Sequence, residues 1–453
     1  MSVSPIEYRY GRDEVKAIFT EEAKLRYMLK VEETLAQAQA EFNIIPKEAF
    51  LDIQSVVDSN LVKVERVKEI ENEIKHDVMA IVRALSEQCT AGQKYVHFGV
   101  TSNDIIDTAT AVQIRDFYSY FIEDLIDLQK SMMKLVDEHR LSVMLGRTHG
   151  QHASPVTFGL KMAVYLAELN RHIERAVQAK SRVIAGKIMG PVGTGASLGE
   201  GALELQDRVM EILGISAEVA SSQIVNRDRY VELLQIFSGV VTSLEKFATE
   251  IRNLQRPEID EVSEYFDASK QVGSSSMPSK VNPINSENIV SLSRLVRSLI
   301  LPEYEAAVTW HERDLTNSAS ERFSIPYSCI LTDHVLVKMT KVFSGLVVKK
   351  ENMLRNLTSD DFVLSERFVS ELTLNGIPRQ EAHEMIREAS MRAYKNHTSL
   401  LKSLDDMGIL AKLSKEKVDA IKDPISFVGR SDKICTVVLE QSERIRRSAL
   451  GAA

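Results

Sequence analysis

The chain has 453 residues, of which 44% are hydrophobic and 26% are charged, and its formal net charge is -8. This balance is ordinary for a folded globular protein and excludes the disordered and collagen-like classes. The acidic net charge also argues against a nucleic-acid partner or an anionic membrane surface, because both need a basic face.

The first twenty residues, MSVSPIEYRYGRDEVKAIFT, lack the apolar core of a signal peptide. No run of about 18 uncharged apolar residues, the length that spans a bilayer, occurs in the chain. The three cysteines, Cys89, Cys329 and Cys435, are odd in number and form no C-x-x-C pair, so neither a disulfide framework nor a zinc site is indicated. We therefore expect a cytoplasmic protein with no membrane partner.

The region between Gly99 and Gly146 predicts one very long helix, because residues 100–145 contain neither glycine nor proline. At about 1.5 Å per residue, most of this stretch would form a helix on the order of 50 Å long. Apolar residues recur within it at steps of three and four: Ile114, Phe117, Phe121, Leu125, Leu128, Met132 and Leu135.

A second long helix is predicted over residues 231–257, with a seam for packing beside other helices. Its apolar positions follow the a and d pattern of such seams, with Phe237, Leu244 and Ile251 seven apart and Val240, Phe247 and Leu254 between them. Residues 160–185, 203–213 and 284–301 also lack glycine and proline. No run alternates at period two, so we expect no strands.

These patterns predict an all-α fold of three helical domains with a central bundle of long helices. The stretches AGQKYVHFG at 91–99 and VKKENMLRN at 348–356 suggest the boundaries. We place an N-terminal helical domain at 1–93, the central long-helix domain at 94–347 and a C-terminal helical domain at 348–453. The central domain includes an irregular loop at 272–287.

That loop begins with VGSSSMPSKVNP, which favours neither helix nor strand. One interpretation is an ordinary connector rich in glycine and serine. The other is a mobile lid whose hydroxyls and amides close over a substrate while Lys280 pairs with an anion. A serine such as Ser274 acts as a base only where N–H donors, a cation or a neighbouring base stabilise its alkoxide.

The stretch GRTHGQHASP places His149 and His152 among polar groups around a glycine, just after the long helix. Histidine titrates near neutral pH, so this place suits general acid/base catalysis. Metal binding by His149 and His152 is the rival interpretation. No H-E-x-x-H pattern supports it, and we expect no metal.

A third polar cluster, WHERDLTNSASER at 310–322, combines Arg313 and Arg322 with the hydroxyls of Thr316 and Ser318. Guanidinium forks and hydroxyls suit a phosphate or a carboxylate, although a solvated helix start of mixed charge is the alternative. The glycines of GPVGTGASLGEG do not form a dinucleotide fingerprint, because their spacing is G-x-G-x-x-x-G and a predicted helix precedes them.

Taken together, these motifs resemble one family. GSSSMPSKVNP resembles the signature loop of the fumarase/aspartase superfamily, whose members release fumarate from a succinyl-type substrate. KHDVMAIVRAL, VHFGVTSNDIIDTA, GRTHGQHASPVTFG and WHERDLTNSASER are similar to the adenylosuccinate lyases in particular, and the resemblance extends from EYRYGR near the start to DPISFVGR near the end.

The resemblance implies a carbon–nitrogen lyase of purine nucleotide biosynthesis. Such an enzyme splits adenylosuccinate into AMP and fumarate by β-elimination and converts SAICAR to AICAR in the same way. It also implies a homotetramer whose active sites are each built from three subunits, with no cofactor and no metal.

By the same resemblance, Ser274 matches the general base, His149 the general acid, Glu287 the carboxylate that pairs with the acid, and His76 a group that orients the substrate. Further positions match the substrate-binding set of the family: Arg9, Tyr10, Lys75, Asp77, Thr101, Ser102, Gln223, Ser275, Lys280, Val281, Asn282, Asn288, Arg313, Ser318 and Arg322.

One residue departs from the family pattern. Ser279 precedes Lys280 where many adenylosuccinate lyases have histidine, so the loop alone does not indicate one substrate.

Two alternative functions remain. Argininosuccinate lyase or fumarase is the alternative among enzymes, and the motif WHERDLTNSASER argues against both. A helical oligomer that has lost activity is the alternative outside enzymes, and the competent residues at every matched position argue against it.

Overall fold

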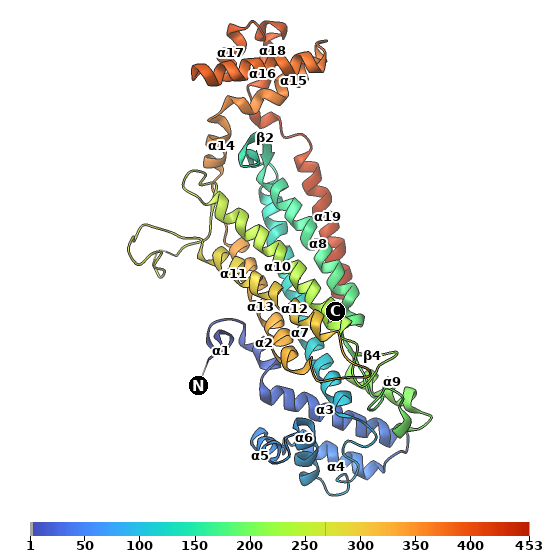
Figure 1. The fold of residues 1–453 in the computed structure, drawn as a ribbon. Coiled ribbons are helices and arrows are strands. Elements are labelled where there is room, and N and C mark those ends of the chain that lie inside the picture. The colour runs from blue at the N-terminus through green and yellow to red at the C-terminus, as the bar shows by residue number, and fades with distance from the viewer. Residues whose placement is uncertain (1–2, 268, 453) are drawn as a thin grey trace.

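The computed structural model describes residues 3–267 and 269–452. Long helices form the centre of the molecule, the N-terminal helices gather at one end, and a small group of C-terminal helices lies at the other (Figure 1). The predicted all-α class is confirmed. The N-terminal helices are α1 (Pro5–Tyr8), α2 (Asp13–Ile18), α3 (Glu21–Glu41), α4 (Lys47–Asp58), α5 (Val64–Ile74) and α6 (Asp77–Gln88).

The middle of the chain contains the bundle, and the last part forms the distal group and returns. The middle helices are α7 (Ser102–Glu138), α8 (Phe158–Val183), α9 (Ala202–Leu213), α10 (Asp228–Leu254), α11 (Ile284–Ser298), α12 (Ile300–Ala306) and α13 (Ser318–Ser344). The last helices are α14 (Lys350–Thr358), α15 (Ser365–Leu374), α16 (Arg379–Asn396), α17 (Leu400–Asp406), α18 (Lys415–Ile421) and α19 (Ser431–Ala452).

The helix α7 is the longest element of the bundle, with 37 residues, which corresponds to about 55 Å. A capping box starts it: the Thr101 side chain accepts a hydrogen bond from the backbone of Asp104, whose carboxylate accepts one from the Thr101 N–H at 2.8 Å. The predicted apolar stripe of this helix is buried throughout, with every member at most 5% exposed. Burial of this stripe fixes α7 firmly within the bundle.

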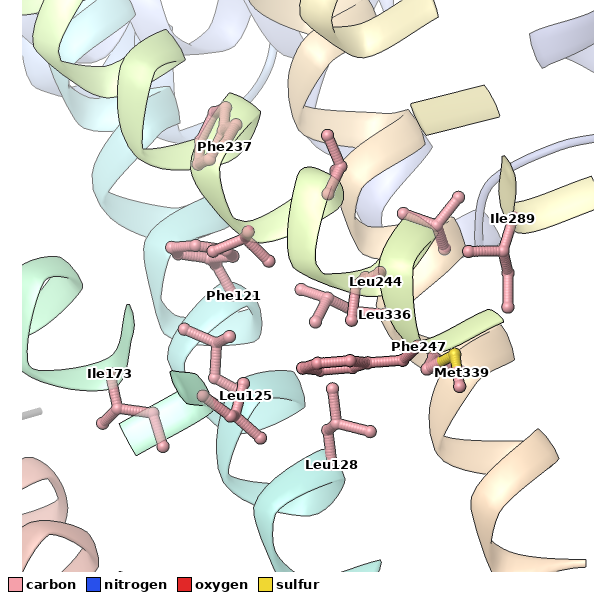
Figure 2. Packing of buried hydrophobic residues seen from close by; sticks show 14 of the residues in the cluster. Phe121, Leu125, Leu128, Ile173, Phe237, Leu244, Phe247, Ile289, Leu336 and Met339 are labelled. Atoms are coloured by element: carbon pink, nitrogen blue, oxygen red, sulfur yellow. The ribbon is translucent and has the colours of Figure 1, made fainter. Parts of the chain in front are cut away.

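The bundle core lies where α7, α8, α10, α11 and α13 meet (Figure 2). The predicted seam of α10 is confirmed, because each of its six positions is at most 2% exposed. Phe237 packs edge-on against Phe121 of α7 with ring centroids 5.0 Å apart, and Phe247 stacks on Tyr165 of α8 at 4.5 Å. Apolar burial of this kind is the main stabilising contribution to such a bundle.

The expectation of no strands is wrong in places. Strands β1 (Val143–Thr148) and β2 (Gln151–Thr157) form an antiparallel hairpin directly after α7. His149 and Gly150 both have positive φ, 53° and 75°, as a two-residue type I′ turn requires. Apolar and polar residues do not alternate clearly along these two strands, because the faces of the hairpin contact several different elements. Two-residue pairs also join β3 (Ala185–Gly186) with β4 (Ser216–Ala217) and β5 (Val262–Ser263) with β6 (Val347–Val348).

Buried apolar residues form three clusters: the bundle core, an N-terminal cluster under α3 to α6, and a C-terminal cluster under α15 to α18. The N-terminal cluster also takes in Ile105, Ala109 and Val112 from the start of α7. Helix α19 leaves the distal group and packs along α8 in the bundle (Figure 1).

The domain boundaries near residues 93 and 347 stay a prediction. Within the described ranges, no helix is long and apolar enough to cross a membrane.

We expect Phe121→Ala to destabilise the fold by about 3–5 kcal/mol, because it would remove a fully buried ring and leave a cavity in the bundle core. Denaturant unfolding followed by circular dichroism measures the change. Leu141→Ala, at a position that is 70% exposed, is the control and should leave the midpoint unchanged. Equal midpoints for the two variants would contradict the role given to this core.

Candidate active site

A hollow of about 300 Å³ lies at the N-terminal end of α7, between α3, α6 and α13. Four predicted binding residues line it: Asp77, Arg313, Ser318 and Arg322. Arg322 Nη2 lies 3.3 Å from the Asp77 carboxylate, and Arg313 Nη1 donates to Gln223 Oε1 at 3.0 Å. The structure therefore gathers residues that are up to 245 positions apart in the chain.

Buried charges fix the wall of this hollow. Arg227 donates to both carboxylate oxygens of Asp107 at 2.7 and 2.9 Å and to Glu321 at 2.9 and 3.1 Å. One helix turn earlier, Asp104 pairs with Lys187, and both side chains are fully buried. Since burying charges is costly unless they are paired, these contacts hold the starts of α7, α10 and α13 in one arrangement.

Several helices begin at the hollow. Its lining includes Thr20, the N-cap of α3, Asp77, the first residue of α6, and Asn317, the N-cap of α13. Asn103 from the first turn of α7 also contributes. Free backbone N–H groups and the helix dipoles make such a place favourable for an anion.

Predicted residues next to the hollow take part in these helix starts. His76 is the N-cap of α6, where its Nδ1 accepts from the Met79 N–H at 3.3 Å. Lys75 precedes it with a positive φ of 58° and an exposed side chain. Thr101 and Ser102 are the N-cap and first residue of α7, and both are partly exposed.

His149 lies at the exposed tip of the β1–β2 hairpin, at the other end of α7. Near this tip, Arg147 holds strand β1 in place, because its guanidinium donates two hydrogen bonds, of 2.9 and 2.8 Å, to the buried carboxylate of Glu261. His152 Nδ1 lies 2.9 Å from Asp360 Oδ2, so this histidine has a structural role in joining the hairpin to Asp360. Across the described residues, no group of three His, Cys, Asp or Glu side chains is placed to hold a metal ion.

The predicted loop at 272–287, called the serine loop from here on, projects from the side of the bundle before α11 (Figure 1). Asn282 Nδ2 donates to the Gly273 carbonyl at 3.1 Å, and a Cβ atom on residue 273 would lie 2.1 Å from the Lys280 carbonyl oxygen, so only glycine fits. Ser274 Oγ accepts from the Met277 N–H at 3.2 Å. A backbone donor at this distance would stabilise negative charge on the hydroxyl oxygen.

The side chains around this serine are open to solvent. Ser275, Lys280 and Val281 are exposed, as is Glu287 in the first turn of α11, whereas Asn288 is partly buried. The C-terminal end of the serine loop is fixed by Glu264. Its carboxylate accepts from Asn285 Nδ2 at 2.9 Å and from the Ser286 N–H at 2.7 Å, at the first turn of α11.

The N-terminal pair of predicted residues lies apart from the hollow. Tyr10 packs edge-on against His334 of α13 with ring centroids 5.4 Å apart, and the exposed Arg9 guanidinium lies 6.0 Å from the Tyr10 ring centre. His334 lines a second hollow of about 540 Å³ together with Glu264 and Lys338.

One chain therefore brings together the predicted residues at the start of α7 and leaves the others separate. His149 and the hollow lie at opposite ends of a helix about 55 Å long. The sequence analysis did not identify Lys24 and Arg227, which also line the hollow. Neither is part of a recognisable motif, so no pattern in the sequence could have indicated them.

Comparison with known proteins gives consistent results along the chain. The family model described as Lyase matches residues 7–297, and that described as Adenylosuccinate lyase C-terminus matches residues 361–438. An adenylosuccinate lyase from Pyrococcus horikoshii is 45% identical over 452 residues, covering 99% of this chain and 100% of that protein. One from Methanocaldococcus jannaschii is 43% identical, covering 97% and 96%. A solved fumarate lyase from Mesorhizobium is 28% identical and has a TM-score of 0.87, covering 95% of this chain and 98% of that one.

A pH-dependent stability is expected from Glu303, a fully buried residue of α12 that accepts from Ser324 Oγ at 2.9 Å. Burial, and then the charge of Glu321, raises the pKa of this carboxyl to about 7. A raised pKa makes the folded state hold a proton that the unfolded chain releases, so this stabilisation is full at low pH and is lost as the pH rises through about 7.

Glu303→Gln, which stays neutral, should therefore raise the thermal unfolding midpoint relative to the unmodified protein at about pH 8 and leave it nearly unchanged at about pH 5. Scanning calorimetry at both pH values measures the difference. Glu305→Gln, an exposed change on the same helix, is the matched control. An increase in the unfolding midpoint of the same size at both pH values would contradict the raised pKa of Glu303.

Proposed function

Since the chain belongs to the adenylosuccinate lyase family and is a carbon–nitrogen lyase, we propose that it eliminates fumarate from adenylosuccinate, leaving AMP, and from SAICAR, leaving AICAR. The observation that carries this proposal is the similarity over 99% of the chain to an adenylosuccinate lyase. The hollow where Arg313, Ser318 and Arg322 meet supports it, because both substrates carry a phosphate and two carboxylates.

In the proposed reaction, Ser274 acts as the general base and removes a proton from the carbon beside a carboxylate. The C–N bond then breaks, a C=C bond forms, and His149 protonates the leaving nitrogen while Glu287 pairs with His149. The N–H donor that points at Ser274 Oγ supports the assignment of the base. Because one proton passes from the substrate carbon to Ser274 and one from His149 to the leaving nitrogen, the elimination balances without a cofactor or a metal.

The remaining candidates hold the substrate in this proposal. Ser275, Lys280 and Asn282 stabilise the charge that develops next to the carboxylate, and Val281 shapes the same loop. His76 orients the substrate between Lys75 and Asp77. The nucleotide and the outer carboxylate are held by a wider set: Arg9, Tyr10, Thr101, Ser102, Gln223, Asn288, Arg313, Ser318 and Arg322.

We also propose a homotetramer with active sites shared between subunits, in the cytoplasm. The separation of His149 from the hollow supports sharing, because a substrate of nucleotide size cannot bridge the length of α7. Exposed large apolar side chains along α11 to α13 offer surfaces for association: Leu295, Leu301, Val308, Trp310 and Phe323.

The first test is to mix the purified protein with adenylosuccinate and to follow AMP and fumarate by absorbance and chromatography. Release of both in equal amounts is expected. No release by a folded oligomer would contradict the proposal, and assays with argininosuccinate and malate would then examine the other lyases of the superfamily.

Ser274→Ala and His149→Ala should each lower kcat by about 100-fold or more, because each removes a proton-transfer group. Steady-state kinetics with adenylosuccinate measures the loss. Ser276→Ala, an exposed change two residues along the same loop, is the matched control and should retain most activity. Turnover near that of the unmodified protein in either main variant would show that its role is assigned wrongly.

Mixing inactive Ser274→Ala and His149→Ala subunits should restore part of the activity, since some shared sites would then contain both functional residues. Activity is measured after the subunits are unfolded and refolded together, with each variant refolded alone as the control. If mixed tetramers verified by mass spectrometry remain inactive, the two residues do not meet from different chains.

A further inference from the structure

Lys24 is a lysine of the hollow that no motif identified. It lies in the first turn of α3, where its backbone N–H donates to the Thr20 carbonyl at 2.9 Å. Its side chain is partly buried and lines both the main hollow and a smaller one of about 180 Å³ next to it. Asp77, Ile106 and Arg322 line both hollows as well, so Lys24 stands where the two adjoin.

Each carboxylate that lines the main hollow is held by another base, and Glu71, which lines the smaller hollow, acts on Lys24 without an ion pair between them. Glu21 pairs with Lys68 at 2.6 Å, Asp77 with Arg322 at 3.3 Å, and Asp107 and Glu321 with Arg227. Within residues 3–267 and 269–452, no carboxylate lies within ion-pair distance of Lys24. Lys24 is therefore a cation that faces the hollow without a partner of its own.

Arg313 is the second such cation in the hollow. Its one hydrogen bond to a side chain in the described structure is to the neutral amide of Gln223, and its buried Nε has no partner. A buried donor left without an acceptor is costly, so an acceptor supplied by a ligand would be favoured here.

Two unpaired cations and several helix starts match a dianion better than a single carboxylate. A phosphate monoester carries about two negative charges and three terminal oxygens that accept hydrogen bonds. Burial, and then the charge of Arg322, lowers the pKa of Lys24, and a bound anion would offset both effects.

We propose that Lys24 binds the phosphate group of the substrate, together with Arg313 and Ser318, and so helps to select nucleotides over free succinyl compounds. This inference rests on the proposed function, because it takes the hollow as the nucleotide end of that site.

The test compares Lys24→Met, which keeps most of the length of the side chain and removes its charge, with the unmodified enzyme. Lys24→Met should raise both the KM for adenylosuccinate and the Ki of inorganic phosphate by about ten-fold, because one charged contact is lost. The Ki of fumarate should not change, and kcat should stay within about two-fold. Lys24→Arg should restore phosphate binding.

The matched control is Arg26→Met, which removes one positive charge from the same helix at an exposed position outside the hollow. It should leave every constant unchanged. Lys24→Gln replaces Lys24→Met if circular dichroism shows that the latter does not fold. An unchanged Ki of phosphate in the neutral variant, or a loss confined to fumarate, would overturn the proposal.

Calorimetric titration of inorganic phosphate separates this inference from the proposed function, because it needs no turnover. If the unmodified protein binds phosphate more tightly than Lys24→Met but does not cleave adenylosuccinate, the lyase assignment fails and the anion site stands. If the protein cleaves adenylosuccinate and both forms bind phosphate equally, the assignment of Lys24 fails.

Discussion

The packing of α7 against its neighbours is the interaction on which the rest of the structure depends. Its apolar stripe is buried from Ile114 to Leu135, so the helix cannot bend or shorten without exposing the bundle core. The elements at its two ends are therefore held at a fixed separation of about 55 Å. This rigidity places the hollow and the His149 hairpin too far apart for one small molecule to contact both within one chain.

Electrostatics defines the end of α7 where the hollow lies. Asp104 and Asp107 are buried one turn apart and are paired with Lys187 and Arg227. Buried ion pairs of this kind contribute more to a defined arrangement than to net stability, because desolvation offsets most of their attraction. Here they orient the helix starts around the hollow, which Arg313 and Lys24 also line.

The other candidate catalytic elements share one anchor. The Glu261 carboxylate accepts hydrogen bonds from Arg147 of the hairpin and from Asn356 of α14, and the chain continues from Glu261 into β5 and then into the serine loop. A change in the position of this carboxylate would move the hairpin and the root of the loop together. His149 at the hairpin tip is exposed, and Ser274 is partly buried in a loop whose neighbouring side chains are exposed.

The sequence by itself determined the long helices, the seam of α10 and the family, because helical periodicity and motif spacing are local and Gly-free segments leave few alternatives. It did not predict the β1–β2 hairpin, whose residues show little alternation, or the lining of the hollow by Lys24 and Arg227. Tertiary structure alone decided which distant charges meet and which stay unpaired, since pairing depends on packing between helices far apart in the chain. That packing set Arg322 beside Asp77 and, among the residues that the structure describes, left Lys24 without an ion pair.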